Sequence, residues 1–157
     1  MTKFLSLLLL GFVVAGCQSN DSTIDPIRPE FENVSFNVVQ KQLVIETELP
    51  SHVEGLASQW FDQKVKVDGF DGEMTFTILE YLQETSSIND GKRVDISLSF
   101  NAILNKPSLS RTQMIEGSVS SYGTLTGNFS LAEFDTIIQN TQSDLILRLS
   151  RDLKSKI

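Results

Sequence analysis

The chain has 157 residues, and its 13 lysine and arginine residues against 20 aspartate and glutamate residues give a net charge of −7. An acidic surface repels phosphate backbones, which excludes nucleic acid as an expected partner. Cys17 is the only cysteine, so no disulfide can form within the chain and a folded domain must rest on its apolar core alone.

The first sixteen residues have the pattern of a secretory signal. Lys3 supplies a positive charge, residues 4–14 form an apolar run, and the small residues Ala15 and Gly16 come just before Cys17. The run is too short to span a bilayer, which takes about 20 apolar residues. We expect residues up to Gly16 to be removed as a signal peptide. Lys3 leaves with them, so the mature chain has 12 basic and 20 acidic residues and a net charge of −8.

A resemblance to the bacterial lipoprotein box lies in the four residues Val14, Ala15, Gly16 and Cys17. The resemblance implies cleavage between Gly16 and Cys17, attachment of diacylglycerol to the thiol of Cys17, and acylation of the new amino terminus. Such an anchor holds firmly, because each buried CH₂ group contributes about 0.8 kcal/mol. Similar lipoproteins kept at the inner membrane tend to carry aspartate where Gln18 stands. The resemblance therefore implies the periplasmic face of the outer membrane.

The segment after Cys17 has the composition of a tether. Residues 18–30 are polar, hold two of the four prolines and show neither helical nor strand periodicity. We therefore assign residues 17–32 to the lipidated cysteine and a flexible tether, with fast amide exchange expected. Residues 33–157 have a length that suits one domain with a single core.

The predicted domain begins with a strand and a helix. Apolar residues alternate over residues 31–49 but change parity partway, which predicts a bulge or bend near residues 39–42. Ser51 and Glu54 have the spacing of a capping box, and Gly69 is a natural stop for the helix that follows. Six residues form the apolar stripe of this helix: Val53, Leu56, Ala57, Trp60, Phe61 and Val65.

Three strands and a second helix follow. Residues 73–84, 94–104 and 112–122 alternate with period two, which predicts a meander with a central second strand and a third strand at an edge or partly exposed. Ser130 and Glu133 form a second capping box, and helical spacing continues from there to the end of the chain. The order β-α-β-β-β-α predicts an α+β two-layer sandwich. Its four-stranded mixed sheet has both helices on one face.

This architecture, with a lipidated cysteine before it, resembles small outer-membrane accessory lipoproteins of envelope transport. Examples are the lipopolysaccharide-assembly lipoprotein and the auxiliary lipoproteins of ABC-type lipid transporters. The resemblance implies a non-enzymatic subunit that binds an envelope protein. Cys17 alone corresponds residue by residue.

Residues that could carry out catalysis are few. His52 is the only histidine and falls in the first turn of the predicted helix. Residues 117–121 lack the second glycine of a nucleophile elbow. Asp68, Asp71 and Glu73 are close in sequence, but their spacing is not that of a calcium loop. We expect no enzyme, no cofactor and no metal site, and a hydrolase is the weakest functional class.

Leu79 and Tyr81 are the candidate partner-binding residues. They alternate with Phe76 and Ile78, so they would lie partly uncovered on the sheet face opposite the helices. A partner could add a strand to the sheet edge and place its side chains on this face. The alternative function, a carrier or sensor of a lipid or other apolar ligand, requires an internal cavity.

Overall fold

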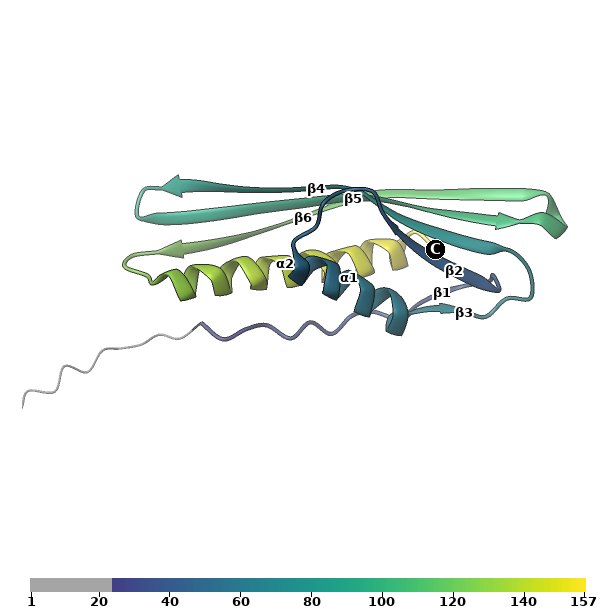
Figure 1. Ribbon diagram of the computed structural model, residues 1–157, viewed down its shortest axis with the longest axis horizontal. Coiled ribbons are helices and arrows are strands. Elements are labelled where there is room, and N and C mark those ends of the chain that lie inside the picture. The colour runs from purple at the N-terminus through teal and green to yellow at the C-terminus, as the bar shows by residue number, and fades with distance from the viewer. Residues whose placement is uncertain (1–23) are drawn as a thin grey trace, which may run out of the picture.

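The structure is a computed structural model that describes residues 24–157. Figure 1 shows a sheet of long strands with the helices on one side of it. The elements in chain order are β1 (Val34–Phe36), β2 (Gln40–Ile45), α1 (Ser51–Lys64), β3 (Val65–Val67), β4 (Glu73–Ile88), β5 (Gly91–Lys106), the 3₁₀ turn η1 (Pro107–Leu109), β6 (Arg111–Thr126) and α2 (Leu131–Ser155). The predicted α+β fold is confirmed.

The main sheet is mixed and has the strand order β2-β4-β5-β6. β2 pairs parallel with β4, and β4, β5 and β6 form an antiparallel meander. Each meander strand has 16 residues, roughly 50 Å at 3.3 Å per residue. The predicted central position of β5 and outer position of β6 are both confirmed.

The change of parity in residues 31–49 is a break between two strands. β1 pairs with β3 in a separate two-stranded sheet, whereas β2 joins the main sheet. Val34 and Phe36 of β1 are buried, and Leu43 and Ile45 of β2 pack against the same core. Both parities reach the core because each strand belongs to a different sheet. The sequence did not predict β3.

Two predictions about α1 are wrong. The residue at the N-cap is Pro50, with φ −57° and ψ 141°, and no side chain caps this end of the helix. Ser51 is already helical, so the predicted capping box does not form. The helix ends at Lys64, before Gly69, because the β-branched residues of β3 pair with β1.

Lys41 of β2 provides hydrogen bonds to the backbone carbonyl groups at the carboxyl end of α1. Its ammonium donates hydrogen bonds to the carbonyl oxygens of Phe61 at 2.6 Å, Asp62 at 3.2 Å and Val65 at 2.7 Å. Burial lowers the pKa of Lys41, and the nearby Asp62 carboxylate opposes this shift. A cation from a neighbouring strand thus takes the place of a glycine cap.

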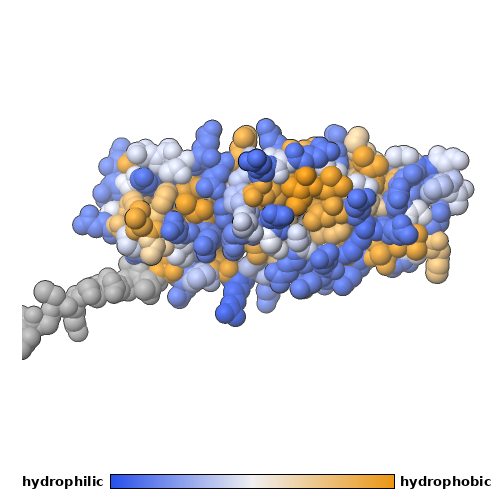
Figure 2. Space-filling model, viewed as in Figure 1, coloured by the Kyte–Doolittle hydropathy of each residue, from blue (hydrophilic) through white to orange (hydrophobic). Residues whose placement is uncertain are grey.

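The core lies between the main sheet and the helices. On the face drawn in Figure 2, apolar residues gather near the middle of the molecule, where β2 leads into α1. Phe76 of β4 is fully buried, with its ring centroid 5.3 Å from those of both Trp60 and Phe100. Buried residues of β5 and α2 complete this layer: Val94, Ile96, Leu98, Phe100, Ala102, Leu104, Leu145, Ile146, Leu149 and Leu153.

Local sequence signals place α2 against β6. The hydroxyl of Ser130 accepts a hydrogen bond from the Glu133 amide at 3.2 Å, and the Glu133 carboxylate accepts one from the Ser130 amide at 2.7 Å. This second capping box is confirmed. In β6, a Cβ atom on Gly123 would collide with Thr141 of α2, and one on Gly117 would also meet atoms of α2. Glycine at both positions lets the helix lie close to the strand.

Part of the segment that the sequence assigns to the tether contacts α2, through the backbone groups of Asp25, Ile27 and Glu32. The Asn140 side chain accepts a hydrogen bond from the Ile27 amide at 2.8 Å and donates one to the Asp25 carbonyl at 3.1 Å. Phe31 then enters the core at 9% exposure. A polar segment docks here because a side-chain amide on α2 satisfies its backbone groups.

Replacing Asn140 with alanine should free this segment. Both hydrogen bonds would be lost, each with a net contribution of about 1 kcal/mol. Exchange of the Ile27 amide, measured by hydrogen–deuterium exchange, should accelerate by on the order of tenfold. The exposed neighbour Gln139 provides the control substitution, also to alanine. Fast exchange of the Ile27 amide in the unaltered protein would show that the segment does not dock in solution.

Candidate functional site

The residues predicted for cleavage and lipidation, Gly16 and Cys17, lie outside the described part of the chain, as do tether residues 18–23. Over residues 24–157, neither helix has the length and apolarity needed to cross a bilayer. The remaining candidate surface is the sheet face that the helices leave open.

The open face mixes apolar and polar side chains. Thr75, Ile103 and Met114 form a row across β4, β5 and β6, and Ile103 and Met114 are 36% and 55% exposed. A second row begins at Leu82, which is 52% exposed. This row continues across the sheet into serines of β5 and β6. This surface can contact apolar side chains of a partner and still leave polar groups in water.

The structure separates Leu79 from Tyr81. The register between β4 and β5 shifts after Ile78, so Leu79 is an extra residue in β4. Tyr81 therefore lies opposite the buried Leu98 on the helix-covered face, and Gln142 of α2 donates a hydrogen bond to its hydroxyl at 3.3 Å. Burial raises the pKa of Tyr81, and this hydrogen bond opposes the shift. The prediction that Tyr81 lies on the open face is wrong, because one extra residue reverses the alternation.

β6 is an outer strand with little protection against pairing. Among residues 24–157, no strand pairs with its outer edge. Its 16 residues include no proline and only two charged residues, Arg111 and Glu116. The Lys156 ammonium covers one backbone acceptor, the Glu116 carbonyl, at 2.9 Å. Long edges usually carry charges, prolines or bulges that prevent pairing with another chain.

A polar cluster lies toward one end of the open face. The Arg93 guanidinium donates hydrogen bonds to both carboxylate oxygens of Asp95 and lies 4.4 Å from the centre of the Tyr122 ring. The hydrogen bonds from Arg93 lower the pKa of Asp95. This exposed pair keeps its charges at neutral pH and marks a polar border of the apolar rows.

The side chains considered for catalysis do not converge. His52 Nε2 lies 3.4 Å from the hydroxyl of Ser143, whereas Ser120 lies on the opposite side of the sheet. Asp71 accepts hydrogen bonds from the backbone and hydroxyl of Ser108, which lower its pKa. Within residues 24–157, no group of three His, Cys, Asp or Glu side chains is arranged to hold a metal ion.

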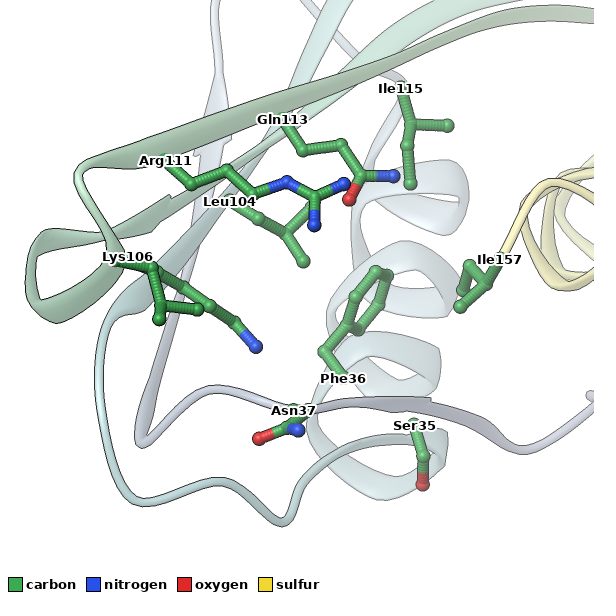
Figure 3. A pocket seen from close by; sticks show the side chains of 10 residues that line it. Ser35, Phe36, Asn37, Leu104, Lys106, Arg111, Gln113, Ile115 and Ile157 are labelled. Atoms are coloured by element: carbon green, nitrogen blue, oxygen red, sulfur yellow. The ribbon is translucent and has the colours of Figure 1, made fainter.

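A cavity of about 270 Å³ lies at the end of the sheet where β5 turns into β6, and sequence reasoning missed it (Figure 3). Lys106 and Arg111 reach toward it from the strand ends, and Phe36 and Leu104 line its inner part. The feature of the sequence that could have indicated this cavity is the pair of cationic residues on either side of the break at Pro107. It could be interpreted only once the β5–β6 register was known, because register decides which side chains face each other.

No protein-family model matches the chain, and its sequence matches no curated protein. Several solved structures have a similar fold. A minor lipoprotein from Acinetobacter baumannii has a TM-score of 0.52 at 10% identity, over 75% of this chain and 93% of that one. Rare lipoprotein B from Shewanella oneidensis has a TM-score of 0.44 at 12% identity, over 74% and 97%. Uncharacterized lipoprotein B from Nitrosomonas europaea has a TM-score of 0.44 at 10% identity, over 83% and 92%.

The likeness to the Acinetobacter protein is one of fold alone, since few residues are identical. It extends over nearly the whole length of that protein. All three of these proteins are named as lipoproteins.

Proposed function

We propose that this protein is a bacterial lipoprotein, anchored through Cys17 to the periplasmic face of the outer membrane. In this proposal it is a non-enzymatic subunit that binds a protein partner in an envelope transport or assembly complex. Two independent observations support the anchor: the lipobox residues before Cys17, and a fold shared with a bacterial lipoprotein.

The observation that carries the partner-binding role is the outer edge of β6, which pairs with no strand in the part of the chain that the structure describes. A strand from the partner can extend the sheet there through main-chain hydrogen bonds, which supply affinity without a deep pocket. Side chains of that strand would alternate between the two faces of the sheet. On the open face they would meet Met114 and the exposed serines Ser118 and Ser120.

This geometry revises the predicted contact residues. Tyr81 packs toward α2 and is withdrawn from the binding surface. Leu79 is 38% exposed at the bulge of β4, two strands away from the β6 edge. Leu79 can contact only a partner that covers the open face of the sheet as well as the β6 edge.

The proposal is tested by adding positive charge to the edge. Ser118→Lys with Ser120→Lys places two lysines on the exposed side of β6, where edge charges oppose strand addition. A photo-crosslinking residue at Met114 should capture one defined envelope protein in intact membranes, and the lysine pair should reduce that adduct at least tenfold. Folding should be unchanged, because both serines are exposed.

The matched control is Ser86→Lys with Ser87→Lys near the end of β4, which adds the same charge at exposed positions. The adduct should persist in this control. If the adduct persists with lysines on β6 but disappears with lysines on β4, the interface lies at the other edge of the sheet. Failure of Met114 to crosslink any envelope protein would contradict the proposal.

A further inference from the structure

The cavity between the β5–β6 turn and β1 has a graded lining. Every second residue of β5 and β6 lies on the same face of the sheet, and on this face opposite residues of the two strands form pairs. Successive pairs lead into the cavity. Lys106 pairs with Arg111 at its mouth, and Leu104 pairs with Gln113 one step further in. Ile115, only 7% exposed, lies deeper. The lining therefore changes from a cationic pair to a pair of one apolar and one amide side chain, and then to the apolar Ile115.

The pair at the mouth joins two like charges. Directly opposite residues on one face of an antiparallel pair have Cβ atoms about 4.5–5.5 Å apart, and like charges there are destabilising. Within residues 24–157, neither Lys106 nor Arg111 lies within ion-pair distance of a carboxylate, although the charge of Lys106 is near enough to help lower the pKa of Asp71. Both stand in a chain whose overall charge is −7. An anion between them would remove the repulsion, so charge complementarity identifies one end of the ligand.

The inner part of the cavity identifies the other end. Phe36 and Leu104 are buried at 1% and 9% exposure, and their side chains face the same space as the Lys106 ammonium (Figure 3). Leu109 of the turn adds an exposed apolar side chain at the opening. Such a lining favours an aliphatic chain over a second charged group.

The walls of the cavity are held in place before any ligand enters. The Asp71 carboxylate accepts a hydrogen bond from the Ser108 amide at 3.1 Å, which fixes the turn between β5 and β6. On the opposite wall, the Asp68 amide donates to the Phe36 carbonyl at 3.1 Å and the Gly69 amide donates to the Val38 carbonyl at 3.1 Å. A preformed site loses less conformational freedom when its ligand binds.

We infer that this cavity binds a single-chain anionic amphiphile, with its carboxylate or phosphate between Lys106 and Arg111 and the first part of its aliphatic chain against Leu104 and Phe36. The volume of about 270 Å³ is small for a drug-sized ligand, and it suits one chain rather than the two chains of a phospholipid. This ligand site is separate from the outer edge of β6, so the inference does not depend on the proposed partner binding.

The test uses octyl phosphate and octanoate as probes, with octanol and inorganic phosphate as the two half-ligands. The full chain is held in phosphatidylcholine nanodiscs, and empty nanodiscs correct for partitioning of the probes. Methyl NMR signals of Leu104 and Ile115 report occupancy of the cavity. At least one of the two amphiphiles, octyl phosphate or octanoate, should shift these signals in a saturable way. Octanol should bind at least tenfold more weakly than that amphiphile, and inorganic phosphate at least tenfold more weakly than octyl phosphate.

Two variants test the cationic mouth. Lys106→Gln with Arg111→Gln should weaken binding of the anionic amphiphile at least tenfold. Lys92→Gln with Arg151→Gln removes the same charge elsewhere and should leave the dissociation constant unchanged. Unshifted methyl signals from the remainder of the core would show that both proteins are folded.

The outcomes separate the possible ligands. Equal binding of octyl phosphate and octanoate would indicate recognition of the shared negative charge, and preference for one would name the headgroup. Octanol binding as tightly as the anionic probes would overturn the role of the cations. Inorganic phosphate binding as tightly as octyl phosphate would overturn the role of the apolar lining. No saturable shift with either amphiphile would overturn the inference as a whole.

Discussion

Cys17→Ser should abolish stable attachment of the protein to the outer membrane. The thioether to diacylglycerol requires a sulfur atom, and serine cannot supply one. Each buried CH₂ contributes about 0.8 kcal/mol, and even a single myristoyl chain gives only marginal, reversible membrane binding. Loss of all chains should therefore move nearly all of the protein out of the outer-membrane fraction, as a released form or an unprocessed precursor.

Membrane fractionation measures this result, and metabolic labelling with radioactive palmitate shows directly whether Cys17 carries lipid. Ser19→Ala is the control, because it alters the same segment without touching the thiol. An unlabelled Cys17→Ser protein that still fractionated with the outer membrane would show that the folded domain, and not lipid, holds the protein there.

Phe76→Ala should cause the largest loss of stability. The Phe76 ring is fully buried and contacts Trp60 edge-on and Phe100 in a stacked arrangement. Truncation of a buried phenylalanine to alanine costs about 3–5 kcal/mol, through lost burial and the cavity that remains. Domains unfold with only about 5–15 kcal/mol in total, so this substitution should remove a large part of the free energy of unfolding.

Urea denaturation measures the change, and Phe70→Ala provides a matched control. Phe70 is 100% exposed, so the same chemical truncation should alter the free energy of unfolding by no more than about 0.5 kcal/mol. Equal losses for the two variants would mean that Phe76 does not lie in the centre of the core.

The meander and α2 were predictable because their signals are local. The buried residues of β5 alternate without interruption from Val94 to Leu104, and only a strand puts such a pattern on one face. Ser130 and Glu133 are three residues apart, and their reciprocal hydrogen bonds depend on nothing outside the first helical turn.

The features that escaped prediction depend on contacts between distant residues. The bulge at Leu79 exists only in relation to the register of β5, so alternation within β4 could not reveal that Tyr81 turns toward the helices. β3 has three residues and gains its partner from β1, about thirty positions earlier in the chain. Docking of residues 25–32 depends on Asn140, a side chain more than a hundred positions away.

If Cys17 carries the proposed lipid anchor, docking of this segment also shortens the greatest distance between the anchor and the domain. The reach from Cys17 to the first docked residue, Asp25, is eight residues, or about 26 Å when fully extended, whereas a tether ending at residue 32 would reach about 50 Å. The volume that the domain can explore falls with the cube of the reach, by about sevenfold. For a partner fixed in the same membrane, a smaller search volume raises the effective concentration of β6 by a similar factor, provided that the tether still spans the gap. The hydrogen bonds of Asn140 would then determine how often the edge strand meets its partner, without contacting either of them.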